Sequence, residues 1–139
     1  MIEGRTVEEV FTAVTFGPTD RDELAEFVPG ALERVRDYLQ RWGAAADGQP
    51  FLRALDDEVE VGFPAATPVG GEGDIEPSEL PAGSVAVALA EGPDLSSVLV
   101  ELDDWIAEQG GAATEPYWEV LLDGTFDGRR HVVQPYATT

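Results

Sequence analysis

Apolar and polar positions alternate along the chain in a way that predicts the same series of elements twice. In the first half, residues 7–16 are rich in β-branched and aromatic side chains and predict a strand. Apolar residues then recur at steps of three and four from Val28 to Trp42, which predicts an amphipathic helix of about four turns. Two short runs, 51–55 and 59–63, predict two further strands. The first half therefore follows the order strand, helix, strand, strand.

Prolines, glycines and small polar residues mark the ends of these elements. Thr19 and Asp20 offer a helix cap, Pro29 suits the first turn of the predicted helix, and Gly43 suits its C-terminal cap. Residues 2–5 match a protease-tag cleavage sequence, so residues 1–5 receive no structural weight.

The second half repeats the order. Residues 84–89 predict a strand, 95–106 carry an apolar stripe at helix spacing, and 116–122 and 131–134 predict two more strands. The turn and cap before the second helix are assigned to Gly92-Pro93-Asp94, and Gly110-Gly111 ends that helix. Between the halves, residues 67–81 are rich in proline and glycine and predict a surface connector with a short edge strand near Ile75.

Turn, aromatic and proline positions correspond between the two halves, which indicates a duplication. The corresponding pairs are Gly17-Pro18 with Gly92-Pro93, Tyr38 with Trp105, Gly43 with Gly110, Pro50 with Pro116, and Pro64 with Pro135. We therefore predict an α+β fold: a tandem pair of strand-helix-strand-strand modules with pseudo-twofold symmetry. Its antiparallel sheet carries the helices on one side and a ligand groove between the modules. The predicted single domain, 1–139, consists of module 6–66, connector 67–81 and module 82–136.

One carboxylate, Glu119, stands in an aromatic and aliphatic run. In a strand, Glu119 shares a face with Tyr117, and Trp118 lies on the other face, which we predict to be core. Matching Pro50 with Pro116 aligns Phe51 with Tyr117 and Arg53 with Glu119. An isolated buried charge costs several kcal/mol or more, so Glu119 is either paired with Arg53 for structure or the polar anchor of a pocket.

Charge is the most unusual bulk property. The chain has 28 acidic residues against 8 arginines and no lysine, for a net charge of −20. A basic patch for a nucleic-acid backbone is absent, which argues against direct nucleic-acid binding. The acids are spread along the whole chain, which favours adaptation to a salt-rich (halophilic) cytoplasm over steering of cationic ligands.

The sequence does not predict a disulfide, a membrane span, a catalytic triad or a metal site. There is no cysteine and no apolar run near the ~20 residues of a membrane span, so we expect a cytoplasmic protein that does not bind membranes. His131 has no Ser or Cys partner in a recognisable motif and is assigned to a strand end at the surface. The run from Asp123 to Gly128 opens like a calcium loop but lacks the acid at its end, so it is interpreted as a hairpin turn. Neither a metal nor a cofactor is expected.

Three short motifs resemble those of the GyrI-like small-molecule-binding domains, also found as effector-binding domains of multidrug-responsive transcription activators. The resemblance covers about residues 6–136 and is carried by Gly48-Gln49-Pro50-Phe51-Leu52-Arg53, by Leu80-Pro81-Ala82-Gly83 leading into Glu91-Gly92-Pro93, and by Glu119-Val120-Leu121-Leu122-Asp123. This chain departs from the family in having Leu89-Ala90-Glu91 in place of a histidine before the Gly-Pro turn, and Leu121 in place of an aromatic residue. The family's fused DNA-binding region is missing from the sequence, so a direct transcription-factor role is not expected.

The resemblance implies that Glu119 faces aromatic or cationic ligands. It also leaves two alternatives open: a hydrolase of electrophilic, cyclopropane-bearing molecules, with Glu119 as general base and Tyr117 or Tyr38 as acid or orienting donor, and an inhibitor of another protein or structural module. We expect first a small-molecule-binding protein, as a monomer or weak homodimer. Its predicted ligand-binding residues are Glu119, Tyr117, Phe51, Arg53, Tyr38, Phe63 and Trp105.

Overall fold

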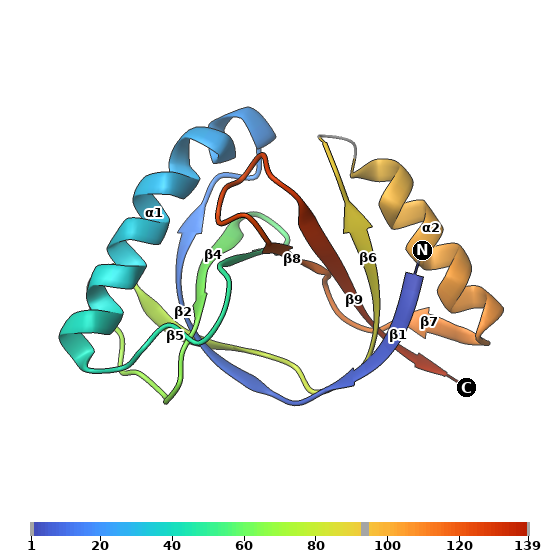
Figure 1. Ribbon diagram of the computed structural model, residues 1–139, viewed down its shortest axis with the longest axis horizontal. Helices are drawn as coiled ribbons and strands as arrows, with labels where there is room; N and C mark the ends of the chain where they lie inside the picture. The colour runs from blue at the N-terminus through green and yellow to red at the C-terminus, as the bar shows by residue number, and fades with distance from the viewer. Residues whose placement is uncertain (1, 93–94, 139) are drawn as a thin grey trace.

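The computed structural model describes residues 2–92 and 95–138, which form a nine-stranded sheet and two helices (Figure 1). The sheet order is β1-β6-β9-β8-β3-β4-β2-β5, with β7 paired to β9 off this path, and every pairing between these strands is antiparallel. The elements are β1 (Ile2–Val7), β2 (Val10–Gly17), α1 (Arg21–Trp42), β3 (Phe51–Ala54), β4 (Val59–Pro64), β5 (Glu76–Leu80), β6 (Gly83–Ala90), α2 (Ser96–Glu108), β7 (Gly111–Ala113), β8 (Trp118–Leu121) and β9 (Arg130–Thr138).

The strand order is symmetric about the centre of the sheet, because corresponding strands of the two modules lie at equal distances from the centre on opposite sides. Strands β3 and β8 pair at the centre, and β4 and β9, then β2 and β6, then β5 and β1 follow outward on the two sides. The series β2-α1-β3-β4 is thus repeated as β6-α2-β8-β9, which confirms the predicted α+β fold. The limits 6–66, 67–81 and 82–136 stay predictions.

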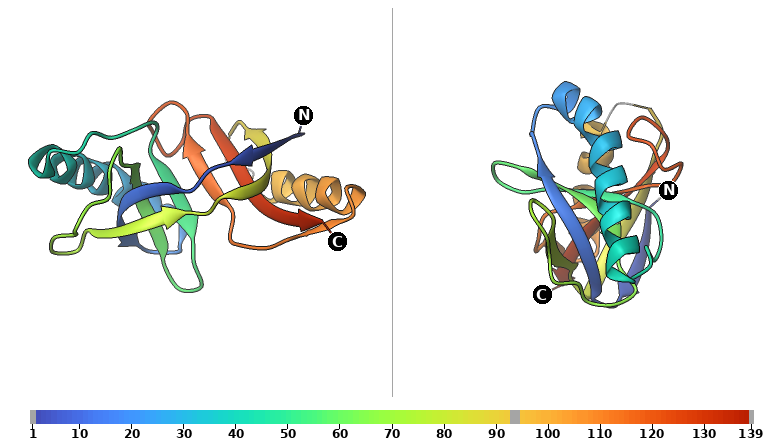
Figure 2. Two further views of the ribbon diagram at one scale, coloured as in Figure 1. Left: turned by 90° about the horizontal axis from the view of Figure 1, so that it is seen from below. Right: turned by 90° about the vertical axis from the view of Figure 1, so that its left-hand side faces the viewer.

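The two modules also exchange strands. β1 directly precedes β2 but pairs with β6 of the second module, and β5 directly precedes β6 but pairs with β2 of the first. Figure 2 shows the two connections running alongside each other below the sheet. The outermost strand on each side of the sheet therefore comes from the chain segment that leads into the other module.

Both helices cover the same face of the sheet. α1 packs on β2 and β4, and α2 packs on β6, β7 and β9, which gives each module its own core cluster. A third cluster lies on the opposite face and includes Val14, Phe51, Trp118 and Val133. Figure 1 shows the N-terminal ends of the two helices near each other, with the β8–β9 loop between them. The helix face therefore has a seam between the modules.

Helix α1 is longer than predicted because it begins at Arg21 rather than at Val28. Asp20 is its N-cap and accepts hydrogen bonds from the backbone N–H groups of Asp22 and Glu23 at 3.0 Å each, and Gly43 ends it with a left-handed φ of 84°. The caps at Asp20 and Gly43 agree with the sequence. The placement of Pro29 in the first turn was wrong: it lies inside the helix.

Two other expectations are corrected at the N-terminal end. Residues 2–5, which received no structural weight, belong to β1, which pairs with β6 in continuous register from Ile2↔Ala88 to Val7↔Gly83. The single strand predicted over 7–16 is consequently divided between β1 and β2. The edge strand expected near Ile75 is present as β5, whereas β7 was not predicted. Pro93 and Asp94 of the predicted turn lie outside the described residues.

Candidate functional site

Glu119 lies at the middle of the sheet, on the seam between the modules. Its cross-strand neighbours are Leu52 on β3 and Val132 on β9. Leu52 belongs to the core cluster under α1, and Val132 to the cluster under α2. Directly paired residues share a face of the sheet, so Glu119 is on the helix face, and it is only 3% exposed. The carboxylate is therefore a buried charge where the modules join.

Two arginines neutralise this carboxylate. Arg21, the first residue of α1, binds it with two hydrogen bonds, from Nη1 to Oε2 at 2.9 Å and from Nη2 to Oε1 at 3.3 Å. Arg130, the first residue of β9, places its Nε 3.5 Å from Oε1 and donates from Nη2 to the carbonyl of Gly92 at 2.6 Å. The charge of the three groups sums to +1.

The two arginines differ in their surroundings. The Arg130 side chain is 2% exposed, whereas the Arg21 side chain is 42% exposed. Burial by itself lowers the pKa of Arg21, but the hydrogen bonds and charge of Glu119 outweigh it, so the pKa of Arg21 is raised above its ordinary value. Arg21 therefore stays charged and is held by Glu119 at the solvent boundary.

The ring of Phe126 contacts the partly exposed guanidinium group of Arg21. The guanidinium carbon of Arg21 lies 4.7 Å from the ring centre of Phe126, within cation–π range. Phe126 belongs to the β8–β9 loop and packs against the α1 core. Arg129 closes the base of this loop, because its backbone N–H and its guanidinium both donate to Asp123. The run 123–128 is thus a hairpin loop, as the sequence predicts.

A cavity of about 340 Å³ adjoins Phe126 between the loop and α1. It is lined by Ala25, Val28, Pro29, Leu32, Gly124, Thr125, Phe126 and Asp127. Arg21, Ala25, Val28 and Leu32 follow one another at steps of four, three and four, so they lie along one side of the helix. The cavity and the Glu119 site are therefore neighbouring parts of one surface.

Tyr117 is the predicted site residue that the structure places in the electrostatic surroundings of Glu119. Burial raises the pKa of the Tyr117 phenol, and the Glu119 carboxylate raises it further, while Arg21 and Arg130 oppose this. The phenol therefore stays protonated at neutral pH.

The predicted pairing of Glu119 with Arg53 is wrong. Arg53 forms an ion pair with Glu60 and donates from Nη2 to Ser78 Oγ at 3.3 Å. In the central pair it is Leu52, not Arg53, that lies opposite Glu119, and Arg53 lies opposite Trp118. Since neighbouring residues of a strand point to opposite faces, Arg53 and Glu119 are on different sides of the sheet. The proline alignment identified corresponding positions but not their faces.

The other predicted aromatic residues are spread over the molecule. Phe51 is buried in the cluster on the opposite face, and Phe63 is buried under α1 with the guanidinium carbon of Arg36 5.0 Å from its ring centre. Trp105 of α2 packs on Tyr136 of β9, with ring centres 5.8 Å apart, against the core cluster of the second module.

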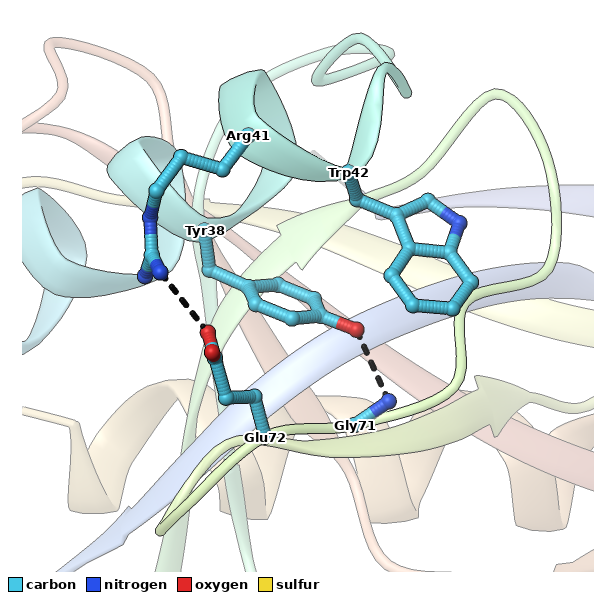
Figure 3. A pocket seen from close by; sticks show the side chains of 5 residues that line it. All are labelled: Tyr38, Arg41, Trp42, Gly71 and Glu72. Atoms are coloured by element: carbon cyan, nitrogen blue, oxygen red, sulfur yellow. Dashed lines mark hydrogen bonds and ion pairs between the residues drawn. The ribbon is translucent and has the colours of Figure 1, made fainter.

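Tyr38 lies near the C-terminal end of α1. Its hydroxyl accepts a hydrogen bond from Gly71 N–H at 2.8 Å and its ring lies beside Trp42, in a cavity of about 180 Å³ (Figure 3). The residues lining this cavity include the ion pair Arg41–Glu72, also drawn in Figure 3. This cavity lies at the C-terminal end of α1, whereas Arg21 binds Glu119 at the N-terminal end, so the two are separate places in the fold.

A further cavity, of about 280 Å³, lies on the face opposite Glu119. Trp118 and Val120, the two neighbours of Glu119 in β8, line it, together with Val85, Val87 and Val133. His131 is at its edge, where burial and the charge of Arg5 lower the imidazole pKa and Glu3 opposes them. This agrees with the predicted apolar face of Trp118.

Sequence reasoning missed Arg21, Arg130 and Phe126. With eight arginines and no lysine, each arginine is a candidate partner for a buried acid. Arg21 also follows the predicted cap Asp20, at a helix end where a positive charge is disfavoured by the helix dipole. That position is the signal that could have indicated a tertiary partner.

None of the helices in residues 2–92 and 95–138 is long and apolar enough to cross a membrane. No protein-family model matches the chain. No curated protein matches it either.

Solved structures do resemble the chain. The EcmrR–DNA complex in EcmrR-RPo matches with a TM-score of 0.82 at 16% identity over 100% of this chain, which spans 58% of the EcmrR chain. The EcmrR C-terminal domain matches with a TM-score of 0.79 at 14% identity, over 100% of this chain and 98% of that one. SAV2435, solved bound to tetraphenylphosphonium, matches with a TM-score of 0.59 at 11% identity, over 99% and 94% of the two chains. The chain thus has the fold of the EcmrR C-terminal domain, consistent with the GyrI-like fold that the sequence implies.

Proposed function

We propose that this chain is a small-molecule-binding protein that holds an aromatic or cationic ligand on the helix face, at the seam between the modules, with Glu119 as the polar anchor. The observation that carries the proposal is the way Glu119 holds Arg21. A planar cation lies with its N–H edge on a buried carboxylate and its guanidinium group in contact with the ring of Phe126. Those are the contacts a receptor for a flat cation needs.

Tyr117 and Phe126 supply the remaining ligand contacts in this proposal. The Tyr117 phenol offers a donor, and Phe126 offers a ring face beside an open cavity. Of the other residues predicted as ligand contacts, Phe51, Phe63, Tyr38 and Trp105 serve packing and Arg53 serves the ion pair with Glu60. The complex of SAV2435 with tetraphenylphosphonium supports an aromatic cation as the class to test.

Hydrolysis is the second candidate, because a neighbour of the same fold is described as a hydrolase from Listeria innocua, with a TM-score of 0.67 at 11% identity over 98% of this chain. Glu119 would be the general base and Tyr117 the donor. In the present arrangement, both carboxylate oxygens accept hydrogen bonds from Arg21. Glu119 can therefore act as a general base only after Arg21 has moved away. As an anchor for a cation, Glu119 would make the same kind of contact that it already makes with Arg21.

Glu119→Gln tests the proposal, because it keeps the shape and removes the charge. We expect an aromatic monocation with N–H donors, such as benzamidine, to bind more weakly by about 1–3 kcal/mol, the range for a hydrogen bond to a charged group, in calorimetric titrations. Glu60→Gln is the matched control, since Glu60 is equally buried and also paired with an arginine, but on the other face. Cation binding should be unchanged in Glu60→Gln.

The outcomes separate the candidates. Loss of turnover with retained binding in Glu119→Gln would favour the hydrolase. Absence of binding in all three proteins, with Glu119→Gln merely less stable, would show that the carboxylate is structural.

A further inference from the structure

We propose that Arg21 is a built-in competitor for the ligand at Glu119, and that it restricts the ligand to a planar aromatic cation with a single positive charge. This inference rests on the proposed function. It starts from the two arginines around Glu119, which play different parts although both are paired with the same carboxylate.

Arg130 is the permanent partner. It begins β9 at a position paired on both sides, with Ala90 on β6 and Leu121 on β8, and its guanidinium is tied to the Gly92 carbonyl. Within the described residues, its Nε has no hydrogen-bond acceptor, although it is 3.5 Å from Glu119 Oε1. Glu119 therefore keeps a buried counter-charge, with a spare donor, when Arg21 leaves.

Arg21 is free to leave. Its guanidinium makes hydrogen bonds to Glu119 and contacts Phe126, and the side chain is 42% exposed. It occupies the first position of α1, where the N-terminal end of the helix disfavours a cation and where the backbone N–H groups have no partner within the helix. Turning the side chain into solvent therefore leaves the helix and its Asp20 cap intact.

The charge of the site sets the charge of the ligand. Glu119 with Arg130 alone is neutral, and Arg21 brings the sum to +1. A ligand with one positive charge reproduces the resting state, whereas a second charge would have to be desolvated without a partner.

The shape of the site sets the shape of the ligand. The Arg21 head fits between the carboxylate and the Phe126 ring as a flat group with N–H donors in its plane, which an amidinium or guanidinium reproduces. The cavity of about 340 Å³ along the same side of α1 has room for an attached aromatic body. Pro29 lies in its wall and has no N–H to give to the carbonyl of Ala25, which also lines the cavity.

Benzamidine is the probe, because it is a flat aromatic monocation. We expect Arg21→Ala to bind it about tenfold more tightly than the natural sequence, if the carboxylate is free about one-tenth of the time when Arg21 is present. The affinity for benzamide, the neutral analogue, should be the same in Arg21→Ala and in the natural sequence. Terephthalamidine, the planar dication, should gain less than benzamidine. Titrations in 0.3 M KCl screen the non-specific attraction of a chain with net charge −20.

Arg34→Ala is the matched control. It removes the same charge from the same helix, at an exposed ion pair with Asp74 that lies away from Glu119. If only Arg21→Ala binds benzamidine more tightly, and Arg34→Ala has the affinity of the natural sequence, the result supports Arg21 as a competitor for Glu119. Equal affinity in all three proteins overturns it while leaving ligand binding at Glu119 intact. Absence of binding to all three proteins, tetraphenylphosphonium included, overturns the proposed function as well.

Thermal melting keeps the test decisive if Arg21→Ala is unstable. Benzamidine should then restore its melting temperature, because the ligand replaces the missing guanidinium, and benzamide should not. Equal effects of the two compounds would contradict a site that recognises the charge.

Discussion

Glu119 and Glu60 are both buried glutamates paired with arginine, and both lie in the same sheet, yet they differ in how the pairing is built. Glu60 and Arg53 are directly opposite each other on adjacent strands, and Ser78 donates a further hydrogen bond to the Glu60 carboxylate at 2.8 Å. Glu119 takes Arg21 from a helix 98 residues away along the chain. The first pair is fixed by the strand register, whereas the second depends on a side chain that extends from another element.

Exposure makes the same distinction. The arginine of the Glu60 pair is 12% exposed, against 42% for Arg21. Opening the Glu60 pair would leave two buried charges, but opening the contact with Arg21 moves one charge to water and leaves Glu119 with Arg130. We therefore expect the Glu60 carboxylate, whose partner is buried, to be structural, and the Glu119 carboxylate, whose partner Arg21 is partly exposed, to be available for binding.

The largest difference is expected when each arginine is removed. Arg53→Met should lower the free energy of unfolding by about 3–5 kcal/mol, because Glu60 remains buried without its counter-charge. Arg21→Met should cost about 1 kcal/mol or less, since Arg21 is half-exposed and Arg130 stays. Urea denaturation measures both values. Equal losses in the two variants would mean that Arg21 is as structural as Arg53.

Salt should sharpen the same comparison. Chloride and potassium screen the repulsion among the negative charges, so we expect the melting temperature of the natural sequence to rise from low to molar KCl. The stability difference between the natural sequence and Arg21→Met should shrink with salt, because that pair is partly exposed. The difference for Arg53→Met should hardly change. A flat or falling melting curve would speak against adaptation of this acidic surface to salt and for a role in attracting cations.

The smallest expected effect concerns pH and Tyr117. Burial and Glu119 raise the pKa of this phenol above its ordinary value of 10.0. As pH rises through 10, the unfolded chain therefore loses the proton before the folded chain does, and stability falls. Tyr117→Phe should have a shallower loss of stability between pH 9 and about 11. Tyr136→Phe is the control for removing one phenol, and an equal change in both variants would contradict the special surroundings of Tyr117.

The fold was predictable from the sequence because it is encoded in local patterns. Turn residues, helix stripes and apolar runs recur in both halves, and the caps at Asp20 and Gly43 are local signals that the structure repeats. The strand β1 was missed because residues 2–5 match a protease-tag cleavage sequence and received no structural weight. This strand, Ile2–Val7, is mostly exposed and is held by its pairing with β6 rather than by a buried face of its own. The start of α1 was misplaced because Pro29 was taken as a boundary.

The site was predictable only in part. Glu119 stood out because a charge in an apolar run needs a partner, and strand alternation correctly placed it away from Trp118. Its partner Arg21 was missed, because the contact forms through the packing of α1 on the sheet, and the only local signal was a positive charge at the start of a helix. Phe126, which contacts Arg21, is brought there by the β8–β9 loop, and the sequence pattern does not encode that approach. Arg53 was chosen by the duplication, but the register at the centre of the sheet places it on the other face.

The most direct test of the central claim is a crystal structure of the protein soaked with a planar aromatic monocation such as benzamidine. The account predicts the amidinium within hydrogen-bonding distance of the Glu119 carboxylate, its ring beside Phe126, Arg21 turned to solvent, and Arg130 unmoved. Benzamidine in the cavity lined by Trp118 and Val120 on the opposite face, with the contact between Arg21 and Glu119 intact, would contradict it.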